Sequence, residues 1–219
     1  MANKQIPVVE SILSANDLIA EQNRAILRAN HVHTINIMAA PGAGKTSLIL
    51  QAIRGLRGEV SIGVIEGDVA SDVDAVKVRS EGVPVVQINT GGGCHLDAPQ
   101  IRAALAQLPL AELDLLFIEN VGNLICPVGF DLGEETRMAI ASIPEGDDKP
   151  LKYPSIFHEV DALVISKMDL LPYITFNLDE YRRLVRSIKP GIRLFEVSCV
   201  TGQGMAEWLE WLKTLPSRA

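Results

Sequence analysis

The stretch Ala39–Thr46, with the sequence AAPGAGKT, follows the apolar segment Val32–Met38 and opens onto a helix-like run that begins at Ser47. A strand, a glycine-rich loop and a helix in this order are typical of a phosphate-binding P-loop. The glycines let backbone N–H groups turn towards a polyphosphate, and the helix directs its positive N-terminal end at the same charge. In this pattern Lys45 neutralises the β- and γ-phosphates, and Thr46 offers its hydroxyl to Mg²⁺.

We therefore expect a nucleotide to bind along this loop and the first turn of the helix. Ala39 occupies the position where the pattern usually has its first glycine, and a small residue fits there if its φ angle is negative. The alternative is an ordinary glycine-rich turn with an exposed lysine, and the flanking strand and helix favour the P-loop. The candidate nucleotide-binding residues are Gly42, Ala43, Gly44, Lys45, Thr46 and Ser47.

The composition limits the class of protein. The chain has 219 residues, 47% of them hydrophobic and 21% charged, as expected of a globular protein with one substantial core. Its net charge of −7 argues against a non-specific nucleic-acid binder or a basic membrane-surface protein. We find no apolar run long enough to span a bilayer and no signal-peptide pattern after Met1. Three cysteines are too few for a disulfide framework, so we expect a cytoplasmic location.

Strand-like and helix-like segments alternate after an amphipathic segment near residues 9–29. The strand-like segments are continuously apolar, which is typical of parallel strands that are covered on both faces. The alternation predicts an α/β protein with a three-layer P-loop NTPase fold, in which a mainly parallel sheet has helices on both faces and follows an N-terminal amphipathic helix. We expect strands at 32–38, 60–65, 84–88, 113–118, 161–166 and 192–197, and helices near 45–55, 72–81, 97–107, 178–188 and 203–214.

We expect two parts of unequal size. Residues 1–30 form an N-terminal helical extension packed on the core, and residues 31–219 form the P-loop domain. The segment 123–157 interrupts the alternation with several prolines and a charged run at 145–149. We interpret it as a long insertion with one strand near Arg137–Ile143, and long irregular segments of compact domains are often functional.

Two segments that follow later strands indicate which base is bound. Ser166–Asp169, with the sequence SKMD, lies at the carboxyl edge of the expected sheet, where ligands of such sheets bind. A carboxylate at Asp169 can accept hydrogen bonds from N1–H and the exocyclic amine of guanine, a pair of donors that adenine lacks. The usual guanine motif is Asn-Lys-x-Asp, with serine here in place of asparagine, and a strand followed by a capped turn is the alternative.

The run Ser198–Gly202, with the sequence SCVTG, follows the next strand and is similar to the fifth G-protein motif, whose backbone contacts the guanine O6. The order of strand, loop and helix fits all three motifs. We therefore expect Lys167, Asp169, Ser198 and Cys199 to contact the base.

Acidic residues at two further strand ends are candidate partners of Mg²⁺. Glu119 stands where the acidic residue of a nucleotide-bound Mg²⁺ site normally lies, and Asp68 ends the preceding strand-like segment. We expect Thr46, Asp68 and Glu119 to surround the metal.

We expect Lys45 and Asp68 to be the catalytic residues, with Asp68 in a switch loop that orients the attacking water or holds the metal. Asp72 and Asp74 lie close to it in the sequence. Acidic residues also stabilise helix N-termini, so this pair fits a charged helix start equally well.

Two cysteines and a histidine form a second candidate site. Cys94 and His95 are adjacent in a glycine-rich segment, and Cys126 follows the strand that ends near Glu119. Thiolate and imidazole groups suit nickel or zinc, and the glycines allow a turn from which both neighbours can bind one ion. Three ligands leave a tetrahedral metal with one position for water or a second subunit. On spacing alone, an inert Cys94 and a surface His95 fit equally well.

Several blocks of the chain also resemble a known family, the HypB GTPases, which assist nickel insertion into [NiFe]-hydrogenase. The similarity covers nearly the whole chain, and the last two blocks are far more specific than a P-loop. The blocks are Pro41–Thr46, Gly67–Val69, Asn89–Ala98, Phe117–Leu124, Cys126–Glu134 and Pro144–Pro154.

The resemblance implies the SIMIBI class of P-loop GTPases, which dimerise face to face around nucleotide. It also implies a nickel or zinc site at the subunit interface, built from the residues that match Cys94, His95 and Cys126. The implied activity is hydrolysis of GTP with Mg²⁺ by a metallochaperone. The implied partners are a second copy of the chain on GTP binding, a nickel-maturation protein and the hydrogenase large subunit, without nucleic acid or membrane.

Three other functions stay open at this point. A related GTPase that serves another metalloenzyme, such as the urease type, is expected to have Cys-Pro-His spacing, whereas Cys94 and His95 are adjacent here. A small-molecule kinase would use the P-loop but would need neither the guanine motif at Asp169 nor Cys126. A non-catalytic nucleotide-gated binding module would bind nucleotide without turnover.

Overall fold

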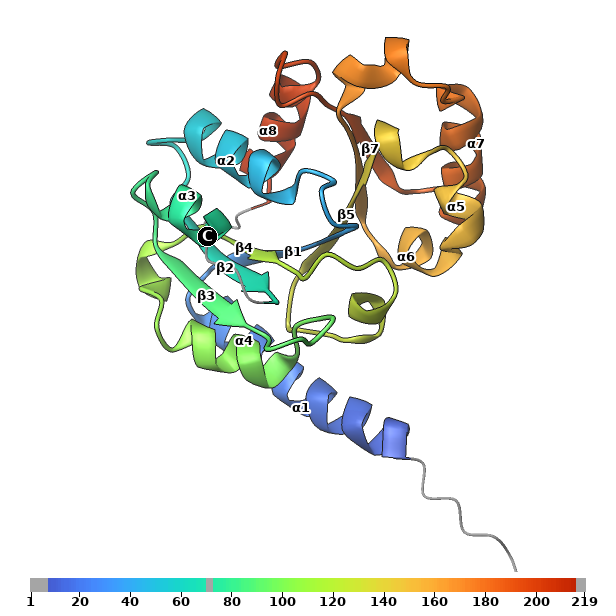
Figure 1. The fold of residues 1–219 in the computed structure, drawn as a ribbon. Coiled ribbons are helices and arrows are strands. Elements are labelled where there is room, and N and C mark those ends of the chain that lie inside the picture. The colour runs from blue at the N-terminus through green and yellow to red at the C-terminus, as the bar shows by residue number, and fades with distance from the viewer. Residues whose placement is uncertain (1–7, 70–72, 216–219) are drawn as a thin grey trace, which may run out of the picture.

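A parallel sheet forms the centre of the computed structural model, which describes residues 8–69 and 73–215 (Figure 1). The sheet has seven strands in the order β3-β2-β4-β1-β5-β6-β7, and every neighbouring pair is parallel. The expected α/β P-loop NTPase fold is confirmed. The strands are β1 (His33–Ala39), β2 (Ile62–Asp68), β3 (Val85–Asn89), β4 (Leu115–Glu119), β5 (Thr136–Ser142), β6 (Ala162–Ser166) and β7 (Arg193–Glu196).

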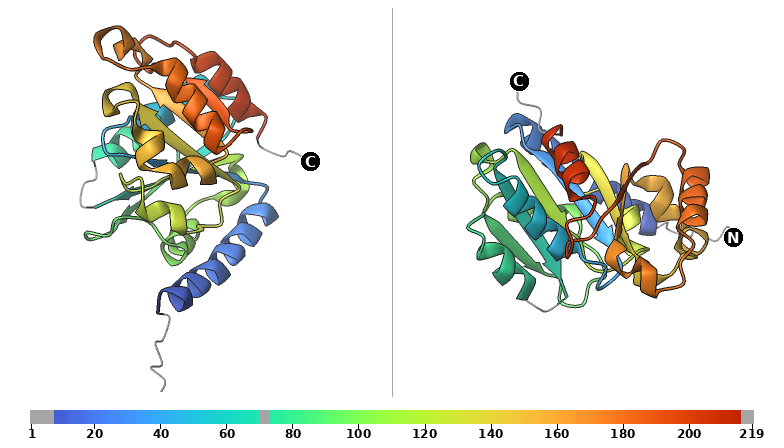
Figure 2. Two further views of the ribbon diagram at one scale, coloured as in Figure 1. Left: turned by 90° about the vertical axis from the view of Figure 1, so that its right-hand side faces the viewer. Right: turned by 90° about the horizontal axis from the view of Figure 1, so that it is seen from above.

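Helices cover both faces of the sheet, as two further views show (Figure 2). The apolar side chains of α2, α3 and α8 pack on one face, and those of α1, α4, α6 and α7 pack on the other. None of the helices in the described residues is long and apolar enough to cross a membrane. The helices are α1 (Val8–Ala29), α2 (Lys45–Gly55), α3 (Val73–Arg79), α4 (Ala98–Leu105), α5 (Lys149–Lys152), α6 (Pro154–Glu159), α7 (Leu178–Ile188) and α8 (Met205–Lys213).

The segment 123–157 is more closely integrated into the sheet than its sequence indicates. The strand expected near Arg137–Ile143 is β5, and it lies between β1 and β6. Two short helices, α5 and α6, follow it and lead into β6. The first part of the segment, up to Gly133, is a loop at the carboxyl edge of the sheet that carries Cys126. The segment 123–157 therefore contains a core strand, which the prolines around it made hard to recognise. The rest of the segment consists of loops and short helices.

In the part of α1 whose burial the structure describes, from Leu13 onward, the buried stripe is half polar. It consists of Asn16, Ala20, Asn23 and Leu27, at spacings that place one residue on each turn. Asn23 donates hydrogen bonds to the carbonyls of Ala98 and Leu132, so the helix is joined to α4 and to the loop before β5. Apolar periodicity alone therefore locates this helix but not its buried face, since Leu18 is 70% exposed.

At the carboxyl end of β4, two consecutive polar residues point to opposite faces of the sheet. Glu119 lies on the face that α2 covers, because it follows Leu115 and Phe117, which pack against that helix. The next residue, Asn120, lies on the opposite face, beside Asn36 of β1. One strand end therefore presents a carboxylate to the P-loop side and a carboxamide to the α4 side.

Candidate functional site

The P-loop has the backbone of a phosphate cradle. Gly42 and Gly44 have φ angles of 74° and 103°, which favour glycine, and Gly44 is the N-cap residue directly before α2. A Cβ atom at either glycine would meet only open space. The loop is therefore held in a left-handed conformation around an open volume, with the positive end of α2 facing it.

Two adjoining cavities of about 250 and 260 Å³ lie in front of this loop. Gly42, Lys45 and Glu119 line both of them, so the two form one continuous site. The Lys45 ammonium lies 3.9 Å from Glu119 Oε1, and the Thr46 hydroxyl donates to the same oxygen at 3.0 Å. These contacts place the Lys45 ammonium and the Thr46 hydroxyl where the nucleotide phosphates and their Mg²⁺ are expected.

A carboxylate that the sequence analysis did not assign lies beside Glu119. Glu66 is paired with Glu119 across β2 and β4, and both side chains are almost fully buried. Burial and the neighbouring Glu119 carboxylate raise the pKa of Glu66 to about 10, and burial also raises the pKa of Glu119. One oxygen of each residue, Oε2, is buried without a hydrogen-bond partner. Buried oxygens that lack a partner fit a divalent cation at this position.

Asp68 lies at the end of β2 and lines the cavity of about 260 Å³, together with Asp74 of α3. Its backbone carbonyl accepts a hydrogen bond of 2.9 Å from the amide of Thr90, where the glycine-rich segment before Cys94 begins. The predicted role of Asp68 in orienting water stays a prediction. Asp72, the other acidic residue considered there, lies outside the described residues.

The two guanine-motif segments meet at the carboxyl edge. The Ser198 hydroxyl donates to Asp169 Oδ1 at 2.5 Å and accepts hydrogen bonds from the amides of Val200 and Thr201. Gln51 of α2 donates to the Cys199 carbonyl at 3.0 Å. A base bound here would meet an oriented carboxylate and a fixed loop backbone, and Gln51, which sequence reasoning missed, holds that loop to the P-loop helix.

The serine that replaces asparagine in this motif has a defined contact. Ser166 is buried, and its hydroxyl donates to the Ala43 carbonyl at 2.7 Å. Lys167 has a left-handed φ of 60°, and its ammonium group donates to the Gly42 carbonyl at 2.7 Å. Ser166 and Lys167 thereby join the segment Ser166–Asp169 to the P-loop, although this segment departs from the usual guanine motif.

Cys94, His95 and Cys126 come together at the same edge of the sheet. Their ligand atoms lie within 4.8 Å of one another, and among the described residues no other group of this kind is found. The Cys94 sulfur is 3.4 Å from His95 Nδ1. Burial lowers the pKa of His95, so its imidazole is neutral and able to bind a metal, whereas a hydrogen bond with Cys126 raises the pKa of Cys94. A metal cation at this site would bind the thiolate form of Cys94 and so displace the proton of its thiol.

Local contacts orient each member of this cluster. The His95 ring stacks on Phe130 with a centroid separation of 3.8 Å. Asn123 accepts a hydrogen bond from the Cys126 amide at 3.2 Å, which begins the short turn Cys126–Gly129. Phe130 and Asn123 support the cluster from the loop that carries Cys126, and no spacing pattern in the sequence marks either residue.

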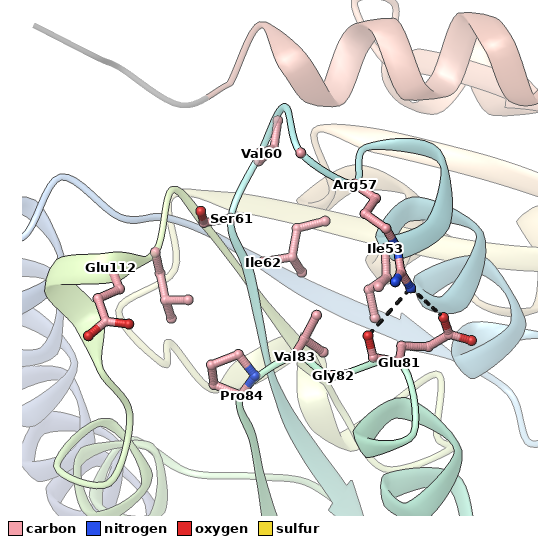
Figure 3. Close-up of a pocket in the computed structure, with 12 residues that line it drawn as sticks. Ile53, Arg57, Val60, Ser61, Ile62, Glu81, Gly82, Val83, Pro84 and Glu112 are labelled. Atoms are coloured by element: carbon pink, nitrogen blue, oxygen red, sulfur yellow. Dashed lines mark hydrogen bonds and ion pairs between the residues drawn. The ribbon is translucent and has the colours of Figure 1, made fainter.

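Another cavity, of about 350 Å³, lies at the opposite, amino edge of the sheet (Figure 3). Loop residues such as Val60 and Pro84 line it, and the ion pair between Arg57 and Glu81 borders it. Its position separates it from the P-loop and from the cysteines.

The fold and these sites define a P-loop nucleotide-binding protein with a cysteine–histidine cluster beside the nucleotide site. Residues 33–196 match the family described as "CobW/HypB/UreG, nucleotide-binding domain". The hydrogenase maturation factor HypB of Azotobacter vinelandii is 46% identical over 211 residues, which are 96% of this chain and 70% of that protein. The chain belongs to the HypB family of hydrogenase maturation factors.

Two solved structures have the same fold. HypB from Archaeoglobus fulgidus superposes with a TM-score of 0.88 at 41% identity, over 94% of this chain and all of that one (100%). HypB from Helicobacter pylori, solved in complex with nickel, superposes with a TM-score of 0.87 at 32% identity, over 94% of this chain and 99% of that one. The resemblance found in the sequence is therefore confirmed.

Proposed function

We propose that this chain is a GTP-hydrolysing, cytoplasmic metallochaperone that assists nickel insertion into [NiFe]-hydrogenase. GTP with Mg²⁺ closes two copies of the chain face to face, and the closure changes the affinity of the cysteine–histidine cluster for nickel. The metal then passes to a nickel-maturation protein and to the hydrogenase large subunit. The observation that supports this most is the cluster of Cys94, His95 and Cys126 at the same sheet edge as the P-loop.

In the nucleotide half of this function, the P-loop amides and Lys45 hold the phosphates, and Asp169 selects guanine. Thr46, Glu119 and Asp68 would hold Mg²⁺, which would neutralise charge that develops on the phosphates. Asp68 orients the attacking water from the end of β2. We expect slow turnover, because the sequence shows no obvious arginine finger that would stabilise the charge of the transition state at the γ-phosphate.

In the metal half, two thiolates and a neutral imidazole bind nickel as cargo, and the fourth position is open for water or a residue of the second copy. Zinc suits the same ligands, so the identity of the metal is part of the proposal. By linkage, a nucleotide that changes nickel affinity must itself be bound more or less tightly when nickel is present.

Release of phosphate from GTP and ATP, followed together with molar mass in solution, tests the nucleotide half. We expect slow hydrolysis of GTP only, a dimer with a GTP analogue, and loss of both in Lys45→Ala. Lys213→Ala serves as the control, because this lysine of α8 pairs with Glu59 and Glu210 and lines neither of the two cavities. Equal turnover of ATP, or GTP hydrolysis by a protein that never dimerises, would contradict the proposal.

A further inference from the structure

We propose that Asn120 is a positioning residue that holds the Cys94–His95 segment against Cys126 and transmits the state of the nucleotide site to it. The inference rests on the proposed function, because it concerns how the same metal cluster is controlled. Asn120 directly follows Glu119, the carboxylate that contacts Thr46 and Lys45.

Asn120 is fully buried, and each end of its carboxamide has partners. Its Oδ1 accepts the amides of Leu96 at 3.1 Å and Val121 at 3.0 Å. Leu96 directly follows His95, so this hydrogen bond fixes the backbone from which the histidine extends. Because the amide of Leu96 is buried, losing its acceptor would leave a buried donor without a partner.

The other end of the carboxamide begins a buried relay to the second half of the cluster. Asn120 Nδ2 donates to Asn36 Oδ1 at 3.1 Å, and Asn36 Nδ2 donates to Glu134 Oε1 at 3.2 Å. Glu134 also accepts from Arg137 at 2.8 Å, and Arg137 donates to the Val128 carbonyl at 3.4 Å. Val128 lies in the short turn that begins at Cys126. The relay therefore joins the segment of His95 to the turn of Cys126.

Glu134 sets the direction of the hydrogen bonds that the two asparagines make in this relay. Its Oε1 accepts from Asn36 and Arg137, so the amine of Asn36 must face it and the oxygen of Asn36 must face Asn120. Asn120 Nδ2 then faces Asn36, so Asn120 Oδ1 is left to accept the hydrogen bond from the Leu96 amide. Only a side chain with one donor and one acceptor at position 120 satisfies both sides, and aspartate lacks the donor.

The position of Asn120 makes it sensitive to the nucleotide. Consecutive residues at the end of a strand point to opposite faces, so a shift of Glu119 on binding Mg²⁺ and nucleotide moves Asn120 on the α4 face. Such a shift changes the hydrogen bond to Leu96 and with it the separation of His95 and Cys126. The nucleotide site and the metal cluster can be coupled without a long-range path, because Glu119 and Asn120 are joined by one peptide bond.

The first test measures the wild-type chain and needs no substitution. We expect the Leu96 amide to be protected from hydrogen exchange, and its protection to change between the GDP state and the GTP-analogue state with Mg²⁺. An amide that exchanges freely, or equally in both states while the protein dimerises, would overturn the proposal.

The second test titrates Ni²⁺ into the 219-residue chain in both nucleotide states and compares Asn120→Asp and Asn120→Ala with wild type. Loss of a residue that orients a metal ligand typically weakens binding about tenfold to a hundredfold, so we expect at least a tenfold loss in Asn120→Ala. Asn120→Asp keeps the acceptor for Leu96 but not the donor to Asn36, so we expect a smaller loss of affinity and a reduced difference between nucleotide states.

Asn16→Asp is the matched control, because Asn16 is buried and bonds the Ala98 amide and the Asp131 carbonyl, outside the relay. It should keep the nickel affinity and its nucleotide dependence. Circular dichroism and GDP affinity check folding. Folded Asn120 variants with wild-type affinity and nucleotide dependence would overturn the role of Asn120 alone. If Cys126→Ser bound nickel as tightly as wild type does, the proposed function and this inference would both be overturned.

Discussion

Replacing Asp169 by asparagine tests the choice of base most sharply. The Ser198 hydroxyl donates to Asp169 Oδ1, and asparagine keeps that acceptor. The amine of the new side chain is therefore left to face the base. Guanine presents two donors at this edge, N1–H and the exocyclic amine. In the variant they would face the NH₂ group of asparagine, which is also a donor, in place of a carboxylate. Xanthine has a carbonyl in place of the amine and can accept from asparagine.

The size of the effect follows from the two hydrogen bonds that are lost. Each hydrogen bond to a charged group contributes about 1.5–3 kcal/mol. Asp169 is only partly buried, so solvent weakens the pair, and we expect a loss of about 2–4 kcal/mol in GDP binding, or about 30- to 700-fold.

Titration calorimetry with GDP, XDP and ADP measures the change. We expect Asp169→Asn to lose GDP affinity, to gain XDP affinity and to leave the weak binding of ADP unchanged. Asp17→Asn makes the same chemical change on α1 and should bind GDP as wild type does. Wild-type GDP affinity in Asp169→Asn would refute the assignment of this residue to the base.

Three further changes probe other parts of the structure. Gly122→Ala places a Cβ 3.0 Å from Pro41 Cα, so we expect a loss of about 1–3 kcal/mol in unfolding free energy, measured with urea, and weaker GDP binding; unchanged values would show that the two loops move apart freely. Lys45→Ala should weaken GTP binding more than GDP binding in calorimetric titrations, because the ammonium contacts the terminal phosphates, and an equal loss would argue against that contact. Burial lowers the pKa of His33, although Glu135 opposes the shift, so the unfolded chain binds more protons near pH 6. Stability should therefore fall from pH 7.5 to 5.5, and less so in His33→Gln, which keeps a polar partner for Thr136; identical pH profiles in urea unfolding would contradict this.

Most strands of the sheet can be predicted from the sequence, because each of them is marked by a short apolar run of consecutive residues. The apolar runs that become β1, β4 and β6 are covered on both faces, so their composition identifies them without any knowledge of partners. The P-loop is equally local, since a strand, two glycines and a helix start are consecutive in the chain. The position of β5 depends on long-range pairing with β1 and β6, which the prolines around it conceal.

The site residues that sequence reasoning missed act through tertiary contacts. Glu66 follows an apolar strand and looks like a strand end, and its importance arises only because register places it beside Glu119. Asn120 occurs next to that glutamate in the sequence, but its partners Leu96 and Asn36 lie 24 and 84 residues away. Buried asparagines carry no periodic signal, so hydrogen-bond networks of this kind become visible only in the folded chain.

Nickel titration of the 219-residue chain with GDP or a GTP analogue bound tests the coupling of nucleotide to metal most directly. We expect one site per chain that is lost in Cys126→Ser, with a different nickel affinity in each nucleotide state. By linkage, adding nickel should change the ratio of GDP affinity to GTP-analogue affinity by the same factor. Identical nickel affinity in the two states would contradict a nucleotide-driven metallochaperone.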